Sequence, residues 1–235
     1  MKYISLTIVF VIFSQILFSQ EPEVKKGIFG FSAGFAFPTG KFADEKDRVD
    51  NSGFALTGQH YALKFDYLLS DNFGIVGTYG RSICPINEHD LMTEIYALNP
   101  LASWEFDEGE FTSSSFLVGF NIQGIDRGFG FDMRLMLGLA YASLPRITAE
   151  GTGYDVPAYL TMRTSGSSSF AYDIGLGLKF YIGKQIAIIT DVDYLGYKPT
   201  YGLSTTSNFG FQSQSTYSEK VNLITWTAGI GVRFE

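Results

Sequence analysis

The chain has 235 residues and a net charge of −7, and an acidic balance argues against a nucleic-acid-binding protein, which needs a basic surface. Its one cysteine, Cys84, excludes a disulfide within the chain. We expect that thiol to be packed away. The 26 glycines, 22 phenylalanines and 14 tyrosines favour strands, tight corners and aromatic side chains at a membrane interface.

The first element in chain order is an apolar segment at the N-terminus. Lys2 precedes an apolar run over residues 4–18, which polar side chains interrupt. The run is shorter than the about 20 residues of a membrane-spanning helix and is typical of a secretory signal peptide. We therefore expect a signal peptide over residues 1–19, cleaved after Ser19, and one outer-membrane β-barrel domain over residues 20–235.

In the rest of the chain, large apolar side chains alternate with small or polar ones in eight segments. A period of two is typical of strands whose two faces meet different surroundings. The clearest case begins at Phe129, where every second residue through Tyr141 is apolar. Pro38, Thr39 and Gly40 are expected to end the first strand. The predicted strands cover residues 27–37, 59–69, 73–80, 115–123, 129–142, 170–181, 186–195 and 224–234.

Short turns and long loops alternate between these strands. The long loops lie near residues 38–58, 83–114, 144–168 and 198–219, and the intervening connections are tight. Outer-membrane barrels have short periplasmic turns and longer extracellular loops. The predicted fold class is therefore all-β, an eight-stranded antiparallel up-and-down transmembrane β-barrel with short periplasmic turns and long extracellular loops.

Lipocalin-like barrels and β-sandwiches also alternate, and the sizes of the two faces decide between them and a membrane barrel. A soluble barrel would bury the large apolar face, but an eight-stranded interior is just wide enough for side chains to fill. The many Phe and Leu side chains of this face exceed that space. Lipid accepts any number of them, so we expect an integral protein of the bacterial outer membrane.

Three local motifs carry a resemblance to known barrels. They are Phe37-Pro38-Thr39-Gly40-Lys41-Phe42, Asp193-Tyr194-Leu195-Gly196-Tyr197-Lys198-Pro199, and the closing Gly229-Ile230-Gly231-Val232-Arg233-Phe234. With them, the chain resembles small eight-stranded outer-membrane barrels of the OmpA/OmpX type, and more closely the porin-family or PorT-like outer-membrane proteins. The resemblance implies that Phe234 is a signal for the barrel-insertion machinery, although Glu235 follows it.

Nine charged side chains fall on the small, inward face of the predicted strands, with nearly balanced signs. Because an unpaired charge is costly in a narrow, partly dry interior, we expect these side chains to pair across strands. Such pairing would plug the lumen, whereas an open charged lumen would form a selective pore; the narrow width favours the plug. The predicted lumen network is Lys64, Asp66, Asp132, Arg134, Asp173, Lys179, Asp191, Asp193 and Arg233.

The second long loop is acidic and contains no Lys or Arg. A short helix is predicted over residues 87–98, and Trp104 and Phe106 are expected to pair with Phe111 across a tight turn. The loop could bind divalent cations that bridge lipopolysaccharide, or a basic partner, or it could simply be solvated. The candidate binding surface is Glu88, Asp90, Glu94, Trp104, Glu105, Asp107, Glu108 and Glu110.

Catalytic signals are weak. His60 and His89 are the two histidines, and neither is predicted beside a serine on the lipid-facing side, where an acyl chain would approach. Metal-ligand spacing, a phosphate loop and a dinucleotide fingerprint are missing. We expect no enzymatic activity, no catalytic residues, no metal site and no cofactor.

The sequence therefore predicts a monomeric outer-membrane barrel with a structural or loop-mediated binding role in the cell envelope. The alternatives are a narrow porin-like diffusion channel and an accessory subunit of an outer-membrane export or assembly complex. Expected partners are outer-membrane lipid and lipopolysaccharide, the barrel-insertion machinery and an extracellular ligand or protein.

Overall fold

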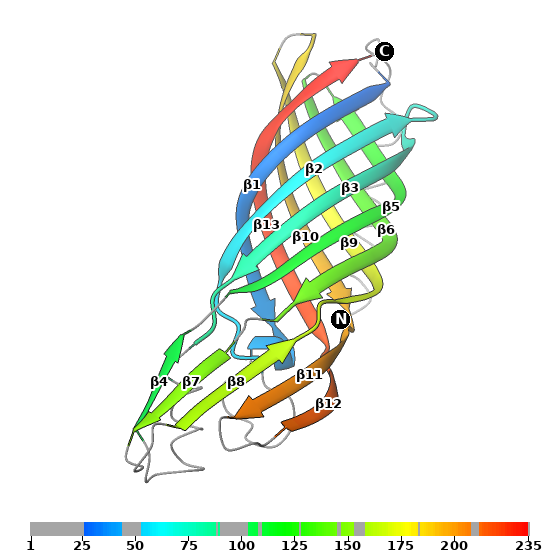
Figure 1. Ribbon diagram of the computed structural model, residues 1–235. Coiled ribbons are helices and arrows are strands. Elements are labelled where there is room, and N and C mark those ends of the chain that lie inside the picture. The colour runs from blue at the N-terminus through cyan, green and yellow to red at the C-terminus, as the bar shows by residue number, and fades with distance from the viewer. Residues whose placement is uncertain are drawn as a thin grey trace, which may run out of the picture.

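Two β-sheets make up most of the molecule. The computed structural model describes residues 26–43, 53–87, 89, 103–107, 110–126, 128–144, 147–152, 158–182, 184–207 and 212–234. One sheet is a closed barrel of eight strands, and the other has five strands and lies beyond one end of the barrel (Figure 1). The predicted signal peptide lies outside the described residues. The described part of the chain holds no helix with the length and hydrophobicity needed to cross a bilayer.

The barrel strands are all antiparallel, and each pairs with its nearest barrel strands along the chain. The first and last close the ring, with pairing that runs from Gly27 opposite Phe234 to Thr39 opposite Asn222. Closure leaves no free strand edge. The predicted fold class is confirmed. The strands are β1 (Gly27–Thr39), β2 (Gly58–Leu68), β3 (Phe73–Cys84), β5 (Phe111–Asp126), β6 (Phe129–Ser143), β9 (Ser167–Ile182), β10 (Ile186–Tyr197) and β13 (Val221–Phe234).

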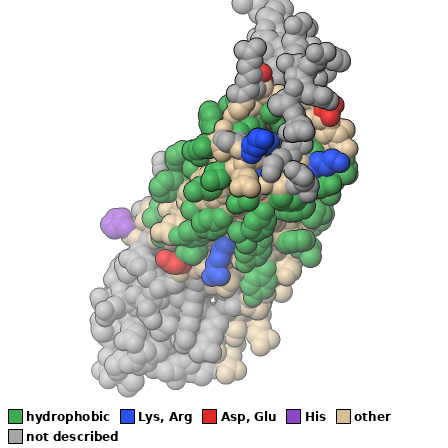
Figure 2. All heavy atoms as spheres, turned by 90° about the horizontal axis from the view of Figure 1, so that it is seen from above, with side chains coloured by type: hydrophobic (Ala, Val, Ile, Leu, Met, Phe, Trp, Pro, Cys, Tyr) green, Lys and Arg blue, Asp and Glu red, His purple; other side chains and the backbone are tan. Residues whose placement is uncertain are grey.

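The two faces of the barrel wall differ as the alternation predicts. Phe116, Leu139, Phe170 and Ile230 are between 61% and 63% exposed, and they belong to a belt of large apolar side chains on the outside of the wall. Figure 2 shows hydrophobic side chains of this kind gathered on one face of the barrel. The intervening residues face the interior and are mostly small or polar, with a few larger apolar side chains such as Met136 and Ile189 among them. A closed wall with this belt satisfies its backbone internally and presents hydrocarbon to lipid.

Several barrel strands extend beyond their predicted ends. Pro38 lies opposite Leu223 and Thr39 opposite Asn222, so the prediction that Pro38 and Thr39 end the first strand is wrong. Proline near a strand end costs at most one ladder hydrogen bond. Pairing therefore continues through Thr39, and Gly40, with a φ of +65°, then turns the chain into the 3-10 helix η1 (Gly40–Ala43). Strand β5 begins four residues early, because its small polar residues hide the alternation.

The three later long loops contribute five strands. They form a five-stranded antiparallel sheet, which we call the loop sheet, in the spatial order β12-β11-β8-β7-β4 (Figure 1). Its residues are mostly polar or small on both faces, so size alternation gives no sign of these strands. The loop strands are β4 (Ser103–Asp107), β7 (Ile147–Thr152), β8 (Ala158–Thr164), β11 (Thr200–Ser207) and β12 (Gln212–Ser218).

The predicted hairpin in the second loop is wrong. Trp104 lies opposite Gly151 and Phe106 opposite Ala149, because β4 pairs with β7 from another loop. Phe111 instead belongs to the barrel strand β5, where it pairs with Cys84. The local turn signal was overridden by pairing between loops that the barrel brings together. Of the helix predicted over residues 87–98, nearly all lies outside the described residues.

Candidate functional site

The centre of the lumen is occupied by Arg134, which projects from β6 and is 1% exposed. Its Nη1 donates hydrogen bonds to Asp132 and, over 2.8 Å, to Asp191. Its Nη2 donates to Asp193 over 2.7 Å. One guanidinium thus holds three carboxylates that come from its own strand and from β10.

Two lysines extend this arrangement across the lumen. Lys64 Nζ on β2 donates to both carboxylate oxygens of Asp191, each at 2.8 Å. Lys179 Nζ on β9 lies 2.9 Å from Asp66 and 3.0 Å from Asp132. The result is one connected set of ion pairs, which we call the lumen ion cluster: Lys64, Asp66, Asp132, Arg134, Lys179, Asp191 and Asp193.

Neutral amides complete the cluster on its periplasmic side. Asn121 donates to Asp66 over 3.3 Å, and Gln123 accepts from Lys179 over 3.2 Å. Charges buried this deeply cost several kcal/mol each in desolvation, which only good geometry and further hydrogen bonds offset. The lumen ion cluster therefore depends on all its members, and removal of one leaves the others buried without compensation.

Glycines on β9 make room for the cluster. A Cβ atom at Gly177 would lie 2.5 Å from the Asp191 carboxylate and 2.6 Å from Arg134 Nη1, and a Cβ at Gly175 would collide with Asp193. Both positions therefore need glycine to let the charged groups lie flat against the strand. The alternation of Asp, Gly, Gly and Lys over residues 173–179 is the sequence signal for this arrangement.

Two members of the predicted network stay outside the ion pairs. Arg233 lies over the ring of Tyr181, 4.2 Å from its centroid. Asp173 on β9 is 4% exposed, and among the described residues its Oδ1 has no hydrogen-bond partner. The structure therefore joins seven of the nine predicted lumen charges.

Beyond the lumen ion cluster, a group of apolar side chains closes the extracellular end of the lumen. Phe42 from η1 packs edge to face against Phe111, with ring centroids 4.5 Å apart. Around this pair lies a cluster that we call the apolar cap: Phe42, Cys84, Phe111, Tyr197, Tyr201, Val221 and Leu223, each at most 3% exposed. Cys84 is a free thiol in this cap, packed away as the sequence predicts.

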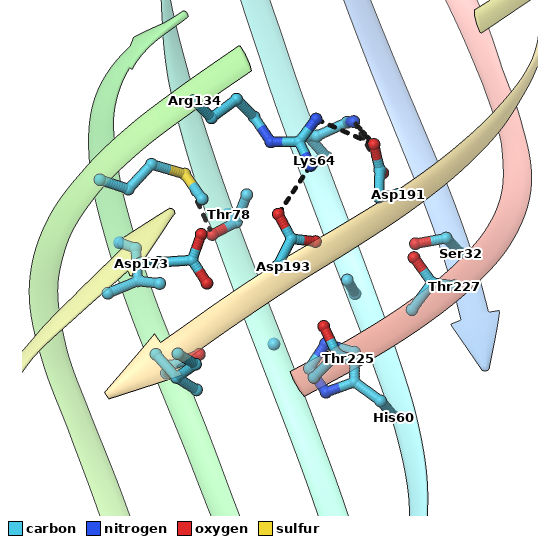
Figure 3. Close-up of a pocket in the computed structure, with 16 residues that line it drawn as sticks. Ser32, His60, Lys64, Thr78, Arg134, Asp173, Asp191, Asp193, Thr225 and Thr227 are labelled. Atoms are coloured by element: carbon cyan, nitrogen blue, oxygen red, sulfur yellow. Dashed lines mark hydrogen bonds and ion pairs between the residues drawn. The ribbon is translucent and has the colours of Figure 1, made fainter. Parts of the chain in front are cut away.

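A small cavity lies between the lumen ion cluster and the apolar cap (Figure 3). Its volume is about 30 Å³, room for one or two water molecules. Asp173, Asp193 and His60 line it together with hydroxyl groups from several strands. His60 Nδ1 lies 2.8 Å from the Ser82 hydroxyl, a neighbour that the sequence analysis did not assign. Both side chains are buried.

The predicted loop surface is only partly described. Glu110 is exposed. Trp104, Glu105 and Asp107 belong to β4 at one edge of the loop sheet. The other predicted residues, Glu88, Asp90, Glu94 and Glu108, lie outside the described residues. Sequence reasoning missed β11 and β12, which extend this surface to its opposite edge.

The predicted insertion residue Phe234 ends the last barrel strand opposite Gly27, and its ring stacks on Phe65 with centroids 5.8 Å apart. In the described ranges, the structure groups no three His, Cys, Asp or Glu side chains in a way that suits a metal ion.

Several solved structures are similar to this chain. They include Ail, the attachment invasion locus protein of Yersinia pestis, at 17% identity over 89% of this chain and 99% of that chain, with a TM-score of 0.44. The outer membrane protein OprG from Pseudomonas aeruginosa has 15% identity over 90% and 97%, with a TM-score of 0.47. A major outer membrane protein from Thermus thermophilus has 12% identity over 88% and 99%, with a TM-score of 0.49.

No protein-family model and no curated protein sequence matches the chain. The closed ring of eight strands and its apolar outer belt place the wall in a bilayer. Closed barrels with this two-faced alternation are proteins of outer membranes. The chain is therefore an integral outer-membrane β-barrel protein of the eight-stranded type.

Proposed function

We propose that this protein is a non-enzymatic, non-conducting barrel that holds the loop sheet at the cell surface, where the sheet binds a ligand or partner. The observation that carries the proposal is a contrast between the two ends of the molecule. The lumen is filled by the lumen ion cluster and the apolar cap, whereas three loops join into an ordered sheet outside the barrel. We therefore assign the binding of a ligand or partner to the loops.

The filled lumen supports a structural role for the barrel over a diffusion pore. A permeant molecule would have to separate the ion pairs around Arg134, whose guanidinium is 1% exposed. It would also have to displace the aromatic pair of Phe42 and Phe111 at the outer end. Both steps expose groups that are now paired or packed, at a cost of several kcal/mol each.

The chemistry of the loop sheet supports recognition of a polar partner. At one edge, β12 presents exposed Gln212, Gln214 and Thr216. The other edge is β4, which contains Glu105 and Asp107, and the sequence that follows it adds Glu108 and Glu110. An acidic edge suits a basic partner, because complementary charge steers association.

The positions of His60 and Ser82 support a non-catalytic role. His60 and Ser82 form a buried pair inside the lumen. A nucleophile and its base must reach a substrate atom, and the apolar cap covers this pair from outside. We therefore assign His60 and Ser82 to packing of the barrel interior.

Conductance and surface binding test the proposal separately. Purified protein in planar bilayers should show no unitary conductance; stable channels in the wild type would favour the pore instead. For binding, labelled oligolysine is the probe, with lipopolysaccharide micelles as a second probe. The variant E105Q/D107N/E108Q/E110Q should lose oligolysine binding, while the matched periplasmic variant D71N/D126N keeps it. Equal binding by both variants, or co-purification with one defined envelope complex, would favour the accessory role.

A further inference from the structure

The inner lumen contains more negative than positive charge. The lumen ion cluster has three cationic and four anionic side chains, and Asp173 adds another carboxylate beside it. Arg233 is held at the periplasmic end by the Tyr181 ring. With all these groups ionised, two negative charges are left without a protein counter-charge among the described residues. A buried charge without a counter-charge is strongly destabilising.

The excess is located at Asp173 and Asp193. They lie on the neighbouring strands β9 and β10, where Asp173 pairs with Leu195 and Asp193 with Gly175. This makes the two carboxylates diagonal neighbours on the inner face, with Cα atoms about 7–8 Å apart, close enough for one ion to bridge them. Both side chains point into the cavity in Figure 3.

Neither carboxylate has hydrogen-bond partners for both of its oxygens among the described residues. Asp173 Oδ1 is buried and has no hydrogen-bond partner in the described part of the chain. Asp193 accepts from Arg134 through one oxygen, Oδ1, and its side chain is 17% exposed toward the cavity. Arg134 cannot neutralise Asp173 as well, because it already holds three carboxylates.

The rest of the cavity supplies neutral oxygen atoms. Thr78 lies within 3.8 Å of the sulfur of Met136, the residue directly opposite Asp173. Further hydroxyl groups line the same space: Ser32, Ser115, Thr225 and Thr227. Two carboxylates, hydroxyl groups and room for one or two water molecules form a set of hard oxygen ligands.

We propose that this cavity is a calcium site, in which one Ca²⁺ bridges Asp173 and Asp193 and is completed by the Thr78 hydroxyl and water. A divalent ion matches the two unbalanced charges, which Na⁺ would not. Ca²⁺ accepts irregular oxygen geometry, whereas Mg²⁺ demands a near-ideal octahedron and keeps several waters, for which about 30 Å³ is too small. The ion ties β9 to β10 from inside the barrel. This site is independent of the function proposed for the loop sheet.

The test compares refolded barrels with isosteric variants. Wild type, D173N and the matched control D126N, whose aspartate is exposed at the periplasmic end of β5, are refolded in detergent with calcium, desalted and analysed for bound metal. Heat-modifiable mobility identifies the folded fraction in each sample. Wild type and D126N should keep one calcium ion per folded chain. D173N should bind calcium on the order of 100-fold more weakly and lose the rise in melting temperature that calcium gives the wild type.

Two further variants keep the test decisive. T78V removes a neutral ligand and should weaken calcium binding even if D173N does not fold. E105Q/D107N/E108Q/E110Q should retain the lumen calcium, because it changes only the acidic loop. The proposal is overturned if the wild type retains no calcium, or if the loop variant loses its calcium. It is also overturned if D173N melts at the same temperature as the wild type, or at a higher one, both in calcium and without it. This last outcome would mean that Asp173 carries a proton.

Discussion

The barrel and the loop sheet are both antiparallel, yet they are held together in different ways. Barrel strands run for 11 to 16 residues and separate a large apolar face from a buried polar one. Strands of the loop sheet run for 5 to 8 residues and are largely polar. Backbone pairing between distant loops, as in β11 with β8, holds the sheet. The barrel is thus specified by its side chains, and the loop sheet by the positions of the strands below it.

This comparison predicts that substitutions inside the barrel affect its stability far more than substitutions in the loop sheet. The largest effect is expected from Arg134→Met, which keeps the length of the side chain but removes its charge. Three carboxylates would lose their shared donor, so the free energy of unfolding should fall by about 3–5 kcal/mol. Urea unfolding in detergent measures this loss. The control Arg81→Met, at an exposed position of β3, should unfold like wild type. Unchanged melting with altered conductance would contradict the plugged lumen.

Substitutions in the apolar cap should cause the second-largest loss of barrel stability. Phe42→Ala removes one ring of the edge-to-face pair and leaves a cavity under the loops, at a cost of about 3 kcal/mol. Cys84 in the same cap gives a local measurement. Its thiol is fully buried and should resist a thiol reagent in the folded wild type, but should react faster in Phe42→Ala. Equal labelling rates in the two proteins would show that the cap does not seal the lumen.

A smaller loss of unfolding free energy is expected from Gly177→Ala. The added methyl group would collide with Asp191 and Arg134, so the lumen ion cluster must shift, at about 1–3 kcal/mol. Gly77→Ala is the matched control, since a Cβ there would have its nearest contacts at 3.9 Å. Melting temperature by heat-modifiable mobility ranks the two variants. If both melted alike, the space at Gly177 would not matter to the cluster.

The smallest effect on the barrel should come from Ser215→Pro in the edge strand β12, where Ser215 lies opposite Leu203. Proline removes a backbone donor there, and we expect a change of no more than about 0.5 kcal/mol in barrel unfolding. Limited proteolysis should meanwhile cut residues 198–220 faster than in wild type. A large drop in barrel stability would mean that the loop sheet also supports the barrel.

The sequence predicted the site unevenly, and the reasons are physical. It identified all seven members of the lumen ion cluster, because a period of two puts alternate residues on one face and inward charges in a narrow lumen must find partners. It could not tell that Asp173 would lack an ion pair or that Arg233 would lie over Tyr181. Those choices depend on depth in the barrel and on which strands are neighbours.

Strand number, antiparallel order and the lipid-facing side chains were therefore determined by the sequence alone, since bulk and polarity alternate along each barrel strand. Tertiary structure decided which charges pair, how the apolar cap closes the lumen and that three loops join in one sheet. The pairing of β4 with β7 illustrates why. Polar strands carry no pattern that selects a partner, so their register is set by the barrel strands that bring the loops side by side.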